Sequence, residues 1–260
     1  MKIWTIANQK GGVGKTTTTV TLGGLLAQHN QRVLLVDTDP HASLSYYFGI
    51  DAEEQSASVY DIFINKDPIT ADKVLDCLCP TKVDGLFVLP ATMALATLDR
   101  QMGSAPGMGL ILKKALACVA DEFDFVLLDC PPVLGVLMVN ALAACHKVII
   151  PVQTEFLALK GLDRMVHTLT IMGRSLNKTF DTIIVPTMFD RRTRAALQAQ
   201  AKLMTDYTDN VWQGMIPVDT HFRDASLGQL PASVLYPRTR GVGAYRLLLK
   251  TLGAGVGDEQ

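Results

Sequence analysis

Two lysines and three glycines lie close together near the N-terminus, in an order suited to holding phosphate groups. The segment 8–17 reads NQKGGVGKTT and lies between a short apolar run and a helix-length pattern. Glycines allow backbone N–H groups to point at phosphate oxygens, and a helix N-terminus adds the positive end of its dipole. Lys15 contributes a full positive charge, and the Thr16 hydroxyl suits Mg²⁺. The residues expected to bind the phosphates are Lys10, Gly11, Gly12, Val13, Gly14, Lys15, Thr16 and Thr17.

The loop departs from the usual phosphate-loop pattern GxxxxGK[ST]. The first glycine of that pattern would fall at Gln9, and an additional lysine, Lys10, precedes Lys15 by five residues. A glycine-rich turn with incidental lysines is the alternative explanation. It accounts poorly for a strand, a loop and a helix that follow one another in this order. The segment is therefore interpreted as a phosphate site with an extra cation.

Aspartates follow two further apolar runs. Asp37 and Asp39 come after the run 33–36, and Asp129 comes after the run 125–128. If these runs are parallel strands, the carboxylates lie at the carboxyl edge of a sheet, where ligands of α/β proteins bind. A carboxylate after a strand often only caps a loop, but beside a phosphate loop it is a candidate Mg²⁺ ligand. The expected metal ligands are Thr16, Asp37, Asp39 and Asp129.

Short apolar runs alternate with longer helical patterns along the chain. Runs that are apolar on both faces and separated by helix-length segments indicate parallel strands covered by helices. The predicted fold class is α/β, a doubly wound, mostly parallel sheet with helices on both faces. The segment 50–85 is expected to form short helices in a peripheral connection. The expected strands are 3–7, 32–36, 86–89, 125–128, 148–152 and 182–185, and the expected helices are 14–28, 107–120, 134–144, 157–173, 193–206 and 236–252.

Composition limits the class of protein. The chain has 260 residues, 48% of them hydrophobic, which favours a single domain over 1–252 followed by a flexible tail, 253–260. A net charge of -1 excludes a general electrostatic attraction to nucleic acid or anionic membranes. Five cysteines without a CxxC pair indicate reduced thiols. No signal peptide and no apolar stretch of about 20 residues is present, so a cytoplasmic protein without a membrane anchor is expected.

Three segments together resemble one protein family. KGGVGKTT, at 10–17, resembles the deviant Walker A motif of the ParA/MinD ATPases. VDTDPH, at 36–41, is similar to their DxDPQ switch with His41 in place of glutamine, and DCPP, at 129–132, is similar to their DxPP switch. The resemblance implies a P-loop NTPase fold of the deviant Walker A class, with ATP and Mg²⁺ as cofactors.

The resemblance also implies roles for individual residues. In the family, ATP holds two subunits together, so a homodimer formed around ATP is implied. Lys10 would reach the phosphates held by the partner subunit, Asp39 would orient the attacking water, and Asp37 would support the Mg²⁺ shell. The residues implied in catalysis are Lys10, Lys15 and Asp39, and hydrolysis slow enough for a switch is implied.

Parts of the C-terminal half resemble segments that hold adenine in the family. They are 186–190 and 216–219, with Met188 and Pro217 as the implied contacts. Arginines before the helix 193–206 correspond to a surface where some members hold DNA non-specifically through phosphates. Alternatively, these arginines are solvent-exposed residues at the start of a helix and bind nothing. The candidate DNA contacts are Arg191, Arg192, Arg194 and also Arg223, which lies two residues after His221, where many ParA proteins have arginine.

The resemblance covers nearly the whole chain, from residue 1 to about 252. The segments 37–49, 96–103, 107–117 and 151–165 are similar to the ParC branch linked with chemotaxis clusters, which implies polar localisation of chemoreceptor arrays. The implied partner is a hydrolysis-stimulating or cargo protein, such as an array or polar hub protein. Chromosome or plasmid partitioning, with a nucleoid-associated protein, is one alternative. An ATP-dependent biosynthetic enzyme of the same fold, such as a cobyrinic acid amidase, is another.

Overall fold

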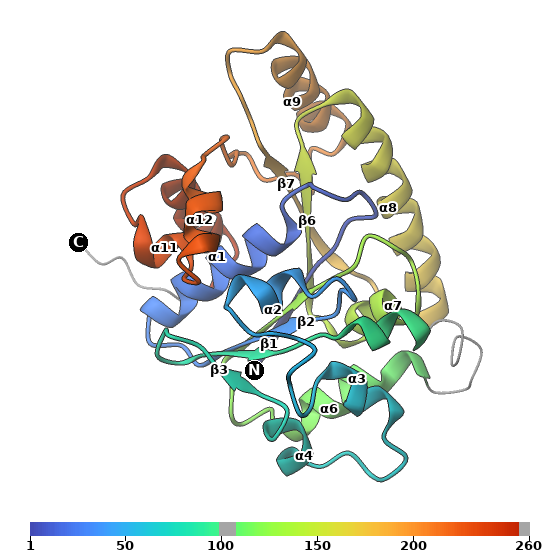
Figure 1. Ribbon diagram of the computed structural model, residues 1–260. Helices are drawn as coiled ribbons and strands as arrows, with labels where there is room; N and C mark the ends of the chain where they lie inside the picture. The colour runs from blue at the N-terminus through green and yellow to red at the C-terminus, as the bar shows by residue number, and fades with distance from the viewer. Residues whose placement is uncertain (99–107, 255–260) are drawn as a thin grey trace.

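The computed structural model describes residues 1–98 and 108–254. Within these residues, seven strands form one sheet in the order β3-β4-β2-β5-β1-β6-β7 (Figure 1). Neighbouring strands are parallel except β3 and β4, which are antiparallel. The predicted mostly parallel α/β sheet is confirmed. The strands are β1 (Lys2–Ile6), β2 (Val33–Asp37), β3 (Cys79–Pro80), β4 (Leu86–Leu89), β5 (Phe125–Asp129), β6 (Lys147–Gln153) and β7 (Asp181–Thr187).

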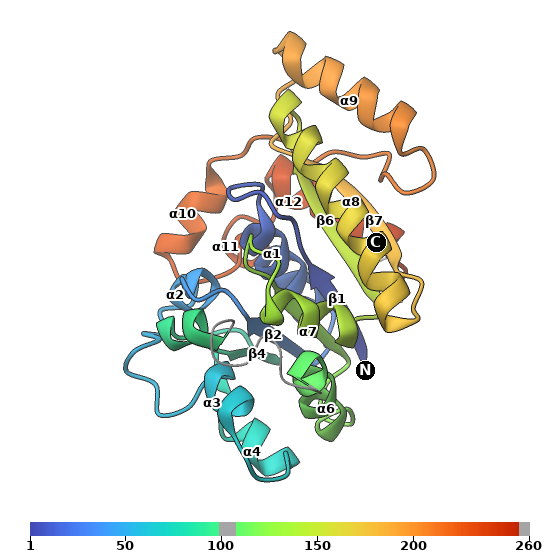
Figure 2. The same ribbon diagram turned by 90° about the vertical axis from the view of Figure 1, so that its right-hand side faces the viewer.

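Helices cover both faces of the sheet. Figure 2 shows α1 and α12 on one side and α7 and α8 on the other. Short 3₁₀ turns at Met93–Thr97 and Met108–Leu110 lie in the connection between β4 and α6. The helices are α1 (Lys15–Gln28), α2 (Ser43–Tyr47), α3 (Val59–Ile64), α4 (Ala71–Leu75), α6 (Ile111–Cys118), α7 (Val136–Ala144), α8 (Phe156–Leu176), α9 (Arg194–Asp206), α10 (His221–Leu227), α11 (Ala232–Leu235) and α12 (Arg240–Thr251).

The sheet separates two hydrophobic cores. Successive residues of a strand face opposite sides, so Leu34 and Val36 of β2 pack in one core with residues of α6, α7 and α8. Val33 and Leu35 pack in the other core with residues of α1 and α12. Because helices cover both faces, every residue of β2 and β5 is buried. The ends of β2 and β5, which carry Asp37 and Asp129, are therefore held in fixed positions.

The last predicted helix, 236–252, starts too early and is corrected by the structure. The separate helix α11 ends at Leu235, and α12 begins at Arg240. The side chain of Thr239 accepts a hydrogen bond from the N–H of Val242, as an N-cap residue does. Pro237 just before it disfavours helical backbone at Tyr236. Strand β3 and helix α10 have no counterpart among the predicted elements.

Two predicted features fall partly outside the described residues. These are the start of the helix 107–120, at Gly107, and the tail from residue 255 onward. Within the tail, Ala254 is described and its exposed fraction is 9%. The short helices expected over 50–85 are confirmed as α3 and α4. Among the described residues, no helix combines the length and the apolar character that crossing a membrane requires.

Candidate functional site

The predicted phosphate loop joins β1 to the N-terminus of α1. Gly12 has φ 74° and Gly14 has φ 93°, both in the left-handed region that side-chain-bearing residues rarely adopt. A Cβ at either position would meet no heavy atom within 4 Å, so the backbone conformation and not space demands glycine. The N–H groups of the loop therefore lie next to the N-terminus of a 14-residue helix, where both can bind an anion.

Long-range hydrogen bonds hold the loop in place. The Asn8 amide donates to the carbonyl of Pro151 in β6 at 2.8 Å, and its oxygen accepts the N–H of Lys10 at 3.0 Å. The Thr187 hydroxyl at the end of β7 donates to the carbonyl of Val13 at 2.8 Å. Two strands that follow more than 130 residues later thus fix the loop's shape.

Lys15 is folded back over the loop. Its Nζ donates to the Lys10 carbonyl at 3.3 Å, and the residue is only 8% exposed. An ammonium group held beside inward-pointing N–H groups makes the loop strongly attractive to anions. Of the predicted phosphate residues, all but Lys10 and Val13 line one cavity.

Thr16 and Asp129 form a polar pair at the base of the loop. The Thr16 hydroxyl donates to Asp129 Oδ2 at 2.6 Å, and the Thr19 hydroxyl donates to Oδ1 at 3.4 Å. Burial, and then the neighbouring Asp37 carboxylate, raise the pKa of Asp129 well above its usual range. A divalent cation would offset both effects, and a hydroxyl with a carboxylate is a donor set that suits Mg²⁺. The pair fits the predicted metal site.

Asp37 and Asp39 are held differently although they are two residues apart. Asp37 pairs in register with Asp129 across β2 and β5 and is fully buried. Its Oδ2 accepts the N–H and the hydroxyl of Ser45 at 2.9 and 2.8 Å, and its Oδ1 accepts the N–H of Asp39 at 3.1 Å. Burial raises the pKa of Asp37 to about 6. Asp37 therefore organises the loop 38–45, while Asp39 faces the phosphate cavity.

Two adjoining cavities open beside the loop. The first, of about 460 Å³, contains most of the predicted phosphate residues together with Asp39 and His41. The second, of about 360 Å³, contains Met188 and Pro217, the predicted adenine contacts. Both cavities include Gly14, Thr17 and Met188 in their walls, so the two cavities adjoin each other. Together they suit a molecule with a phosphate chain at one end and a flat apolar ring at the other.

Lys10, the extra lysine, contacts a carboxylate of its own chain. Its Nζ forms a hydrogen-bonded ion pair with Glu155, and both side chains are partly exposed. Glu155 is the N-cap residue of α8. Glu155 carries no signal of this contact in the sequence, because nothing in the spacing along the chain links it to a residue 145 positions earlier.

Comparison with known proteins agrees with this geometry. A family model described as an AAA domain matches residues 1–182. The chain is 38% identical to the sporulation initiation inhibitor protein Soj of Bacillus subtilis, over 97% of this chain and 98% of that protein. It is 34% identical to the chromosome partitioning protein ParA of Caulobacter vibrioides, over 100% of this chain and 97% of that protein. The chain belongs to the ParA/Soj family of P-loop ATPases.

A solved structure supports the same fold for this ParA/Soj-family chain. It is described as cobyrinic acid a,c-diamide synthase from Mycobacterium smegmatis with a bound ATP analog and magnesium. Its TM-score is 0.82 at 31% identity, and the likeness covers 97% of this chain and 94% of that one. The predicted P-loop fold is thereby confirmed.

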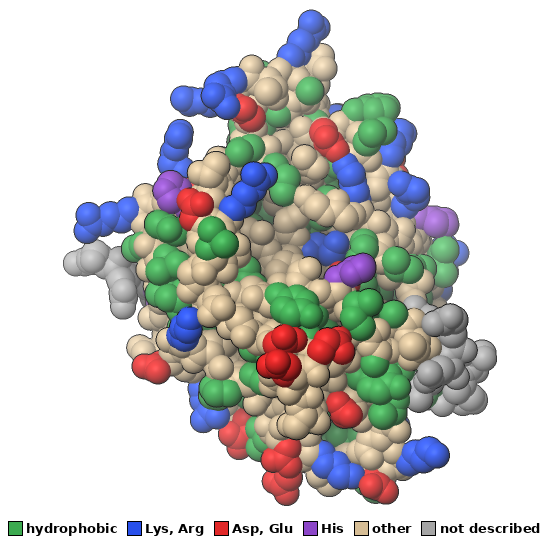
Figure 3. Space-filling view, viewed as in Figure 1, with side chains coloured by type: hydrophobic (Ala, Val, Ile, Leu, Met, Phe, Trp, Pro, Cys, Tyr) green, Lys and Arg blue, Asp and Glu red, His purple; other side chains and the backbone are tan. Residues whose placement is uncertain are grey.

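The four candidate DNA contacts of the ParA/Soj-family chain differ in their surroundings. Arg192 donates from Nε and Nη2 to the two carboxylate oxygens of Asp190 at 2.9 and 2.7 Å, so its charge is largely neutralised. Arg191 and Arg194 are exposed before and at the start of α9. Arg223 lines the second cavity. In Figure 3, Lys and Arg side chains gather over the upper part of the molecule around α9, and acidic side chains gather below.

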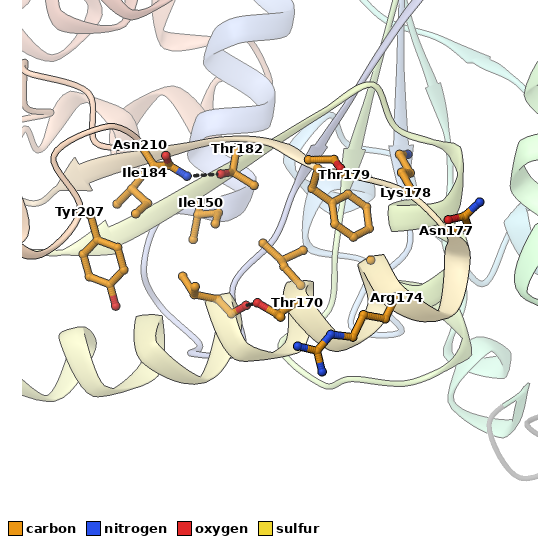
Figure 4. Close-up of a pocket in the computed structure, with 14 residues that line it drawn as sticks. Ile150, Thr170, Arg174, Asn177, Lys178, Thr179, Thr182, Ile184, Tyr207 and Asn210 are labelled. Atoms are coloured by element: carbon orange, nitrogen blue, oxygen red, sulfur yellow. Dashed lines mark hydrogen bonds between the residues drawn. The ribbon is translucent and has the colours of Figure 1, made fainter.

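A groove of about 500 Å³ lies apart from this site. It runs between the C-terminal half of α8 and strands β6 and β7, and it shares no residue with the two cavities. Figure 4 shows Arg174 and Tyr207 among its lining residues, and the Asn210 amide donates to the Thr182 hydroxyl at 2.8 Å. The groove carries none of the predicted phosphate, metal or adenine residues, so it takes no part in the candidate site.

Proposed function

We propose that this ParA/Soj-family protein is an ATP-dependent molecular switch that dimerises around ATP and Mg²⁺ and positions a cargo inside the cell. The observation that carries the proposal is the pair of adjoining cavities, one at the phosphate loop and the other at Met188 and Pro217. Lys15 and the loop N–H groups would hold the phosphates, and Thr16 with Asp129 would hold Mg²⁺. The bound ATP analog and magnesium of the M. smegmatis protein support this assignment.

Slow hydrolysis of ATP would reset the switch. Phosphoryl transfer asks the protein mainly to position the reactants and to neutralise charge. Lys15 supplies charge at the phosphates, and Mg²⁺, when bound, would neutralise developing negative charge on the phosphate oxygens. Asp39 lines the cavity, and its Oδ1 accepts the N–H of His41. We expect its other carboxylate oxygen, Oδ2, to orient the attacking water.

Dimerisation around ATP would use the surface next to the phosphate cavity. Four large apolar side chains adjoin Pro132 and Glu155 in sequence and are strongly exposed, and Pro132 lines the cavity. Burying them in an interface would be favourable by the hydrophobic effect. Lys10 would then exchange its own Glu155 for the phosphates held by the partner subunit. The four side chains are those of Val133, Leu134, Phe156 and Leu157.

Lys10→Ala is expected to abolish the ATP-induced dimer while nucleotide binding by the monomer persists. In the proposed dimer, Lys10 contacts the phosphates of the nucleotide bound by the partner subunit. Lys15 contacts the phosphates bound by its own chain, so the monomer of the variant should still bind nucleotide. Light scattering coupled to gel filtration, with a slowly hydrolysed ATP analog and Mg²⁺, measures the mass. The matched control is Lys114→Ala, which removes an exposed lysine of α6. A normal dimer of the Lys10→Ala protein would refute the cross-dimer role.

The cargo is proposed to be a chemotaxis array at the cell pole, and chromosome or plasmid partitioning is the second candidate. The ParA relative, which is named a chromosome partitioning protein, supports the partitioning candidate. Live-cell imaging of a fluorescent fusion separates the two. Polar foci that disperse in the Lys15→Ala variant are expected, whereas a nucleoid-wide signal would favour partitioning and contact between the arginines and DNA.

A biosynthetic role is the third candidate, since one structural relative carries the name of a cobyrinic acid a,c-diamide synthase. ATP hydrolysis in the absence of any small-molecule substrate distinguishes a switch from such an enzyme. Hydrolysis that required a carboxylic acid substrate would overturn the switch.

A further inference from the structure

The second cavity has apolar and aromatic walls. Phe222 and Tyr245 meet edge to face, with ring centroids 5.6 Å apart and an interplanar angle of 85°. The Tyr245 hydroxyl shares a hydrogen bond of 2.8 Å with Thr18 of α1, which ties this wall to the helix that starts at the phosphate loop. Met188 and Pro217 complete the apolar surface. Such walls suit a flat purine ring.

Arg223 follows Phe222 in α10 and lines the same cavity. The carboxylate that is near it in sequence, Asp219, is already occupied: it accepts the N–H groups of His221 and Gly241 and contacts the His221 ring at 2.7 Å. In residues 1–98 and 108–254, no ion pair or side-chain hydrogen bond of Arg223 is found, in contrast to Arg192 on Asp190. A guanidinium without a carboxylate partner thus lies at the wall of an aromatic cavity.

We infer that Arg223 is a nucleotide-binding residue, which stacks its guanidinium on the purine and donates hydrogen bonds to the ribose end, and that it is not a DNA contact. This inference rests on the proposed function, and it adds a residue to the binding site. A guanidinium is planar, stacks on aromatic faces and donates in several directions, whereas an ammonium does none of these as well.

Isothermal titration with ADP and Mg²⁺ tests this contact in the full chain. Arg223→Ala is expected to weaken ADP binding by roughly fivefold, the loss typical of one cation–π contact at a solvent-accessible position. Arg223→Lys should recover only part of the loss, because the planar group is missing. The matched control, Arg238→Ala, removes an exposed arginine that lines neither cavity and should bind ADP as the unmodified chain does.

The outcomes separate this contact from the proposed function. If the unmodified chain binds ADP and Arg223→Ala binds it equally well, the proposed contact between Arg223 and the nucleotide is refuted. The proposed function as an ATP-dependent switch is then unaffected. Full recovery by Arg223→Lys would refute stacking. Failure of the unmodified chain to bind ADP would overturn both. DNA binding at saturating ATP analog should be unchanged in Arg223→Ala, and a selective loss of DNA binding would reassign the residue to DNA.

Discussion

Replacing Lys15 by alanine is expected to abolish measurable binding of ATP and ADP. The side chain is held over the phosphate loop by a hydrogen bond to the Lys10 carbonyl and is nearly buried, so its charge acts on the phosphates with little screening by water. Loss of a charge-assisted contact of this kind, in a site built around it, should weaken binding by about 100-fold or more. Isothermal titration with ADP and Mg²⁺ measures the affinity directly.

Two controls make the Lys15 result specific. Lys114→Ala removes one positive charge from the exposed surface of α6 and should bind ADP normally. Thermal unfolding followed by circular dichroism should show that Lys15→Ala remains folded, because the alanine leaves the hydrogen bonds of Asn8 and Thr187 to the loop intact. A folded Lys15→Ala protein with unimpaired ADP affinity would contradict the assignment of the loop as the phosphate site.

Replacing Asp39 by alanine is expected to stop ATP hydrolysis while leaving ATP binding and dimerisation in place. Asp39 lines the phosphate cavity, and its carboxylate accepts a hydrogen bond from the N–H of His41 and not from Lys15 or Thr16. Removing a group that orients the attacking water should lower the rate by roughly 100-fold or more. Phosphate release measured with saturating ATP gives the rate, and light scattering shows whether the dimer accumulates.

The matched control for Asp39 is Asp84→Ala, which removes an exposed carboxylate from a loop beside β4. It should hydrolyse ATP at the unmodified rate. If Asp39→Ala instead loses ATP binding, Asp39 serves the metal or the loop and not the water. If it retains the full hydrolysis rate, another group must orient the water.

Much of the fold could be predicted because its signals are local. The strands are runs of apolar residues buried on both sides, and α8 and α9 have clear helical periods. Strand β3 gives no such signal, since two residues are too few to show a period and their pairing with β4 depends on contacts elsewhere in the chain. The final helix was placed too early because a period continues through Tyr236, although the Thr239 cap and Pro237 decide the actual start.

The parts of the site that follow from neighbouring residues were also predicted. The phosphate loop needs glycine, lysine and threonine at fixed spacing, and the strand-end aspartates need only parallel strands to reach the same edge. Which carboxylate faces the cavity did not follow from that pattern. Asp37 and Asp39 are equally acidic and two residues apart, but only the fold brings Ser45 against Asp37 and leaves Asp39 at the cavity.

The sequence by itself determined the α/β class, the phosphate loop with its second lysine, and the strand ends that carry Asp37, Asp39 and Asp129. These depend on residue types and spacings within a few positions, where chain geometry leaves little choice. The tertiary structure alone decided that Lys10 contacts Glu155 and that Arg223 lines the cavity beside Tyr245. Those contacts join residues far apart in the chain, and their positions depend on how the whole sheet and its helices pack.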